Sequence, residues 1–174
     1  MQKNMTLRSL IGKSERKFSK NVGGENIMEI IKSEKGEIIA IIVRSDYDND
    51  GVTFFTPDSF SQQLAYMHHP VGHIILPHVH NEVRREVYYT KETLIIRKGH
   101  LRCDLYSDDR KYQGTVNLQE GDVILLASGG HGFLCETETE FLEIKQGPYV
   151  GEGDKTRFEP YDGEIVIKDI SGKL

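Results

Sequence analysis

Short apolar runs rich in β-branched residues recur along this chain, and each ends at Gly, Asp, Asn or Pro. The clearest runs are 37–44 (EIIAIIVR), 93–99 (TLIIRKG), 123–127 (VILLA) and 140–146 (EFLEIKQ). Runs of this length, bounded by turn residues, are typical of strands, and the chain has no long segment with helical periodicity. Segment 37–44 is apolar at successive positions, so both of its faces should be covered. Many short strands at close spacing predict an all-β sandwich or barrel.

The chain has 174 residues and a formal net charge of -5, which suits one domain and argues against a nucleic-acid partner. We expect a flexible basic N-terminal arm over 1–24 and a single β domain over 25–174. No apolar run approaches the roughly 18–20 residues of a spanning helix, and no signal peptide is visible, so we expect no membrane partner and a cytoplasmic location. Cys103 and Cys135 are expected to be small core residues in a reducing compartment.

Five of the seven histidines lie in the segment 68–92. We expect a hairpin there, with one strand over 63–69, a turn over 70–72 and a return strand over 73–80. Residues two apart on a strand point to the same face, so His78 and His80 could bind one ion together. Further ligands must come from elsewhere. His131, in a glycine-rich turn, is the best remote imidazole; Glu92 is the best carboxylate, with Glu86 and Glu82 as rivals.

Two spaced motifs resemble those of the cupin superfamily. Gly72 is followed after five residues by His78-Val79-His80, and Glu92 is followed after six residues by Gly99; the stretch 121–131 (GDVILLASGGH) is similar to the second cupin motif. The resemblance implies a single jelly-roll barrel holding one divalent metal (Zn, Fe, Ni or Mn) through His78, His80, Glu92 and His131. Eleven residues separate His80 from Glu92, where cupins have three or four. Glu92 is preferred to Glu86 because it alone keeps the spacing to Gly99.

The stretch 125–158 is also similar to small single-domain cupins that accompany bacterial sugar and surface-polysaccharide pathways. The resemblance implies a metal-binding cupin that acts on a small sugar-like or carbonyl-containing metabolite, as an isomerase, an epimerase or a dioxygenase. The alternatives are a module that binds a metal or small ligand without turnover, and a structural subunit. Fold alone does not choose among them.

Other side chains are candidates for binding or catalysis. Arg84 and Arg85 could clamp a carboxylate or phosphate, and Tyr89 could wall a substrate. Tyr88, Glu143 and Lys145 are candidate catalytic groups. Glu143 and Lys145 share one face of a strand and are expected to form an ion pair on the outer face, with a catalytic pair inside the barrel as the alternative. A homodimer is expected because jelly-roll sheets have edges to cover, with the N-terminal arm and 164–170 as the segments that cross to the partner.

Overall fold

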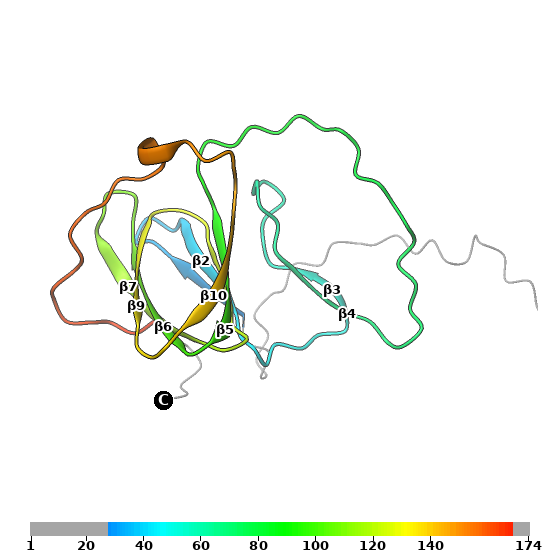
Figure 1. Cartoon of the computed structure of the whole chain (residues 1–174), viewed down its shortest axis with the longest axis horizontal. Coiled ribbons are helices and arrows are strands. Elements are labelled where there is room, and N and C mark those ends of the chain that lie inside the picture. The colour runs from blue at the N-terminus through cyan, green and yellow to red at the C-terminus, as the bar shows by residue number, and fades with distance from the viewer. Residues whose placement is uncertain (1–27, 169–174) are drawn as a thin grey trace, which may run out of the picture.

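The computed structural model describes residues 28–168, and these fold into strands and loops with one short 3-10 helix, Gly151–Asp154. The larger of two main sheets is antiparallel and holds five strands. Across it lie β1 (Met28–Lys32), β2 (Ile38–Val43), β8 (Val123–Leu126), β5 (Glu92–Lys98) and β10 (Glu140–Lys145). The smaller sheet holds β7 (Tyr112–Gln119), β6 (His100–Tyr106) and β9 (Gly130–Cys135). A separate hairpin pairs β3 (Gly51–Phe54) with β4 (Ala65–His68). Figure 1 shows the two main sheets beside this hairpin.

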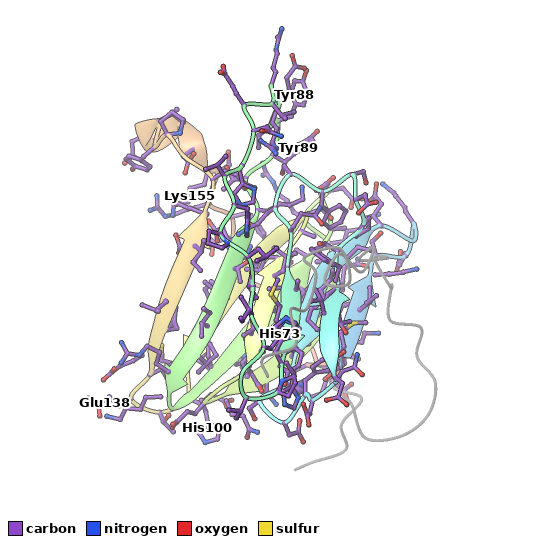
Figure 2. All side chains as sticks on the ribbon, turned by 90° about the vertical axis from the view of Figure 1, so that its right-hand side faces the viewer. His73, Tyr88, Tyr89, His100, Glu138 and Lys155 are labelled. Carbon is purple, nitrogen blue, oxygen red and sulfur yellow. The ribbon has the colours of Figure 1, made fainter. Side chains whose placement is uncertain are left out.

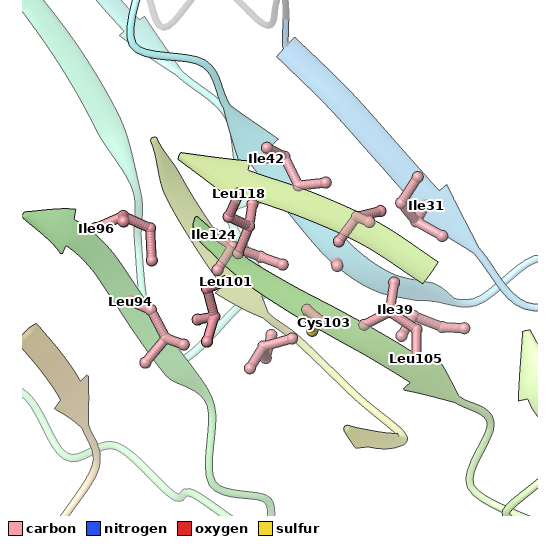
Figure 3. Packing of buried hydrophobic residues seen from close by; sticks show 13 residues of the cluster. Ile31, Ile39, Ile42, Leu94, Ile96, Leu101, Cys103, Leu105, Leu118 and Ile124 are labelled. Carbon is pink, nitrogen blue, oxygen red and sulfur yellow. The ribbon is translucent and has the colours of Figure 1, made fainter. Parts of the chain in front are cut away.

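The main core lies between the two sheets, and aliphatic side chains from both fill it (Figure 3). Ile42, Leu94 and Ile124 contribute from the large sheet, and Leu101 and Leu105 from the small one. All five are completely buried. At roughly 1.5–3 kcal/mol for each buried side chain of this size, the contact between the sheets is the main source of stability.

A second apolar cluster covers the outer face of the large sheet. Ile41 of β2 and Leu125 of β8 pack there with Tyr47, Phe55 and Tyr66, which lie in or next to the β3–β4 hairpin. The Tyr47 ring makes edge-to-face contacts with the rings of Phe55 and Tyr66, both at 5.0 Å between centroids. The hairpin therefore holds β2 from outside, which confirms that segment 37–44 is covered on both faces.

A buried ion-pair network fixes the end of β2 opposite the start of β8. The Arg44 guanidinium donates to Glu29 in β1 at 2.7 Å, to Asp122 at 2.9 Å and to the Asn117 carbonyl oxygen at 2.7 Å. Asp122 also accepts from the backbone N–H of Ser45. The Arg44 side chain is 7% exposed and both carboxylates are less exposed still. One guanidinium thus joins β1, β2 and the turn between β7 and β8.

The all-β prediction is confirmed, but the sheets do not close into a barrel. β10 is an edge of the large sheet and β9 an edge of the small sheet. Phe133 of β9 and Phe141 of β10 face each other with ring centroids 6.2 Å apart. The side of the sandwich between these two edges is open.

The predicted hairpin of 63–69 with 73–80 is wrong in its pairing. Residues 65–68 do form a strand, but its partner is β3, which precedes it in the chain. Tyr66 of this strand and Phe55, the residue after β3, both contact the Tyr47 ring. Residues 69–91, which we call the β4–β5 connection, contain no strand. Figure 1 shows them as a wide loop extending away from the two main sheets.

The two cysteines differ in exposure. Cys103 is buried as expected, but Cys135 is exposed because it ends the open edge strand β9.

The chain ends were expected to cross to a partner. The N-terminal arm, 1–24, lies outside the described residues. In the final segment, Val166 and Lys168 exchange backbone hydrogen bonds with Thr115 of β7, so this part lies along its own small sheet.

Replacing Arg44 with Met should lower the free energy of unfolding by about 3–5 kcal/mol, because it leaves Glu29 and Asp122 buried without their cation. Urea denaturation followed by circular dichroism measures this loss. The matched control is Lys98→Met, which breaks the exposed Lys98–Glu138 pair and should cost less than about 1 kcal/mol. Equal losses in the two variants would contradict a structural role for the Arg44 network.

Candidate functional site

A cavity of about 1440 Å³ opens at the end of the sandwich where β5 and β9 begin and β10 ends. Glu92, His131 and Glu143 line it, with Phe133 and Phe141 on the apolar side. Figure 2 shows Tyr88, Tyr89 and Lys155 at this end of the sheets, and His100 and Glu138 at the opposite end. The volume is sufficient for a metabolite larger than a simple sugar, because small-molecule sites commonly measure ~300–1,000 Å³.

Glu92 and His131 form the central pair of the cavity. His131 Nε2 lies 3.0 Å from Glu92 Oε2, and their side chains are 27% and 16% exposed. Glu92 is the first residue of β5, and His131 is the second of β9. The turn before β9 requires a glycine at position 129, where φ is +72° and a Cβ would overlap the Tyr106 carbonyl oxygen. That turn brings the imidazole back over the start of β5.

Lys145 places a positive charge beside this pair. Its ammonium nitrogen lies 3.4 Å from Glu143, 3.7 Å from Asp154 and 3.8 Å from Glu92, measured to a carboxylate oxygen of each. Burial lowers the pKa of Lys145, but the carboxylates of Glu143, Glu92 and Asp154 outweigh it and leave the pKa above its ordinary value. The ammonium is therefore charged at neutral pH.

The hydrogen bond to His131 lowers the pKa of Glu92. Partial burial opposes the shift, and the charges of His131, Lys145 and Lys155 reinforce it. Glu92 is thus an ionised carboxylate that accepts from the imidazole and is stabilised by a nearby ammonium.

The predicted four-ligand metal set is not assembled within the described residues. Glu92 and His131 are together, as predicted, but His78 and His80 lie on the exposed β4–β5 connection. Their rings are 5.4 Å apart, and His78 Nδ1 contacts the Leu76 carbonyl oxygen at 3.0 Å. Within residues 28–168 no group of three or more His, Cys, Asp and Glu side chains could hold a metal ion. Within one chain, His78 and His80 are not brought beside His131, because 73–80 forms no strand next to β9.

Of the remaining candidates on the β4–β5 connection, some line the cavity and others do not. Glu86 accepts from Arg84 at 2.7 Å and from the Tyr88 hydroxyl at 2.9 Å, so this rival carboxylate is engaged away from His131. Neither Arg84 nor Arg85 lines the cavity, so the structure does not place the predicted anion clamp at the site. Tyr88 and Tyr89 do line its rim, although both rings are largely exposed.

Glu143 and Lys145 form the expected ion pair, at 3.4 Å, but on the cavity-facing side of β10 rather than on its outer face. Both residues share the face of β10 that carries Phe141, which packs against the main core. Sequence reasoning missed Asp154, the third carboxylate around Lys145. It lies in the 3-10 helix after β10, and only its acidic GEGD segment gave a signal.

Comparison of the chain with protein-family models, with curated proteins and with solved structures gives no match. Among residues 28–168, no helix is long and apolar enough to cross a membrane.

Replacing Glu92 with Gln should destabilise the protein by about 1–2 kcal/mol at pH 7, the contribution of one charge-assisted hydrogen bond. Because the folded-state pKa of Glu92 is lowered, this stabilisation is fully present above the ordinary value of 4.5 and is lost as the pH falls through the lower folded value. Urea denaturation at pH 7 and pH 3 measures the difference between wild type and variant at each pH. A difference that does not shrink at pH 3 would contradict the assignment. Glu86→Gln, on the exposed connection, is the control and should change little at either pH.

Proposed function

We propose that the cavity binds a small sugar-like or carbonyl-containing metabolite and that the Glu92–His131 pair transfers a proton to or from it. The observation that carries this proposal is the half-buried carboxylate–imidazole contact of 3.0 Å inside a large cavity. Imidazole is the side chain that most readily gives and takes a proton near neutral pH.

Each nitrogen of the ring would have its own role. His131 Nε2 lies 3.0 Å from Glu92 Oε2, so Nε2–H would donate to the carboxylate and Nδ1 would be the atom that takes the substrate proton. Nδ1 would remove a proton from the carbon next to a carbonyl, and the bonding electrons would move to the carbonyl oxygen as an enolate. Return of the proton to the other face, or to the neighbouring carbon, completes an epimerisation or an isomerisation.

Lys145 would stabilise the charge that develops on the enolate oxygen. A fixed ammonium in a partly dry site is worth more than the same charge in water, because the local dielectric constant is lower. Glu143 and Asp154 hold this ammonium in place. Tyr88 and Tyr89 at the rim would contact the sugar.

The jelly-roll form of the fold belongs to the same proposal. From β5 to β10 the chain passes between sheets: β5, β8 and β10 belong to the large sheet, and β6, β7 and β9 to the small one. Repeated crossing between two antiparallel sheets supports a jelly roll of the cupin type, with the open side between β9 and β10 as the place for the missing strands.

A divalent metal site is the second candidate. His131 Nε2 and Glu92 Oε2 are 3.0 Å apart, a separation that two ligands of one ion can have when each bond is ~2.0–2.2 Å. Within one chain the cavity holds only these two of the four predicted ligands, and no chemical step is assigned to a metal.

Proton transfer is tested by incubating the protein in D2O with a panel of keto sugars, nucleoside-diphosphate-linked keto sugars and 2-hydroxy ketones. We expect deuterium at the carbon next to the carbonyl of at least one compound, measured by mass spectrometry. His131→Gln should slow the exchange by ~10²–10⁴-fold, the usual contribution of a general base. The control, His100→Gln, changes a histidine at the opposite end of the sheets and should leave it unchanged. No exchange with any compound would overturn the acid–base proposal.

The two candidates are separated by the metal content of the untagged chain, measured by mass spectrometry beside a His131→Ala variant. The acid–base proposal expects no stoichiometric metal, and exchange that survives a chelator. Near-stoichiometric Zn, Fe, Ni or Mn that disappears in the variant would replace it with the metal site.

A further inference from the structure

We propose that a second copy of this chain completes the sandwich, and that the β4–β5 connection of each copy lies antiparallel along the open edge of β9 in the other. This exchange does not depend on the chemistry proposed for the cavity. The exchange does supply residues to the cavity, because the β4–β5 connection of one copy reaches the cavity opening of the other copy.

The connection is too apolar for a surface loop. Residues 70–90 are all exposed, and large apolar side chains occur throughout them: Val71, Ile74, Ile75, Leu76, Val79, Val83, Val87, Tyr88 and Tyr89. Ile74 is 75% exposed and Val79 87% exposed. None of the nine belongs to either core cluster. A monomeric protein rarely exposes more than a few hundred Å² of contiguous apolar surface. We therefore expect the apolar side chains of this segment to pack against another protein surface.

The surface that fits it is the open side of the sandwich. Among residues 28–168, β9 pairs only with β6 and β10 only with β5, so each has one edge without a strand partner. On β10 the Ile144 carbonyl oxygen accepts from the Gln62 side chain at 3.4 Å. Exposed apolar side chains flank these edges: Phe133 and Leu134 on β9, and Leu142 and Ile144 on β10. An apolar strand added at such an edge satisfies the backbone groups and covers the side chains.

The way β4 is held favours a second copy over closure onto the same chain. β4 is paired with β3 over four residue positions, and Tyr66 packs against Tyr47 on the outer face of the large sheet. Asp48 accepts from the Tyr66 hydroxyl at 3.0 Å and lies 2.8 Å from His68 Nδ1. The connection therefore starts on the outside of its own large sheet, directed away from its own β9 edge (Figure 1).

Strand direction sets which residues would enter the cavity. β9 starts at the cavity with Gly130 and His131 and ends at Cys135. A strand antiparallel to it places its last residues, His78 and His80, beside His131, and its first residues near Cys135. Ile74, Leu76, His78 and His80 then share the inward face. Pro77 is compatible with this placement because the added strand has a partner on one side only.

The exchange is reciprocal, so each copy gives one strand and receives one around a single two-fold axis. The interface then holds two added strands, each paired through its backbone with β9 and each with Ile74 and Leu76 facing inward.

The first test is the mass of the purified chain in solution by light scattering, with Ile74→Asp/Leu76→Asp as the variant. We expect a dimeric wild type and a monomeric double variant, because both aspartates would enter the partner's interior. The matched control is Ile75→Asp, which changes the opposite face of the same strand and should remain a dimer. Far-ultraviolet circular dichroism checks that the variants are folded. A monomeric wild type, or a double variant that stays dimeric, would overturn the proposal.

The second test uses the exposed Cys135 as a probe of strand placement. Oxidation of Ile74→Cys should join the two chains through Cys135, giving a covalent dimer on a non-reducing gel that disappears in Ile74→Cys/Cys135→Ser. Cys103 is buried and does not compete. Tyr88→Cys, beyond the other end of the added strand, should give no such dimer. A disulfide within one chain would show that the connection closes its own sandwich, and the absence of any disulfide at position 74 would place it elsewhere; either result overturns the exchange.

Discussion

The buried Arg44 guanidinium is the interaction on which the placement of the site depends. It anchors Asp122, the residue before β8, to β1 and to the end of β2. β8 then runs between β2 and β5, with Leu126 opposite both Ala40 and Glu92. A fixed start for β8 therefore fixes where it ends, and the turn that follows it carries His131 to Glu92. A charged network at one end of the sandwich sets the geometry of the cavity at the other.

The strands could be predicted from the sequence where the local pattern decides the structure. The runs at 37–44, 93–99, 123–127 and 140–146 all contain strands, because β-branched residues between turn residues favour extended backbone. The contact of Glu92 with His131 could also be predicted. Glu92 opens one apolar run and His131 follows another, and the spacings around both resemble the cupin motifs. The strands and this contact were both predicted from short sequence patterns around the residues concerned.

The partner of 65–68 could not be predicted, because strand pairing depends on what the rest of the chain offers. Two candidate partners, 51–54 and 73–80, lie on either side of it, and the aromatic contacts of Tyr47 that favour the first arise only in three dimensions. The position of Lys145 was misjudged for a similar reason. Burying an ammonium is costly when it lacks paired charges. Here Glu92, Glu143 and the distant Asp154 surround it, and the sequence does not bring Asp154 close to Lys145.

The tail along β7 has a consequence for how copies of this chain can associate. β7 is the edge of the small sheet opposite β9, and the backbone of Val166 and Lys168 is hydrogen-bonded to Thr115 within it. Part of that edge is thus occupied by the chain's own tail, whereas β9 has no such neighbour among residues 28–168. A sheet that can grow at one edge reaches a closed pair and stops, whereas a sheet with two free edges could propagate into a fibre.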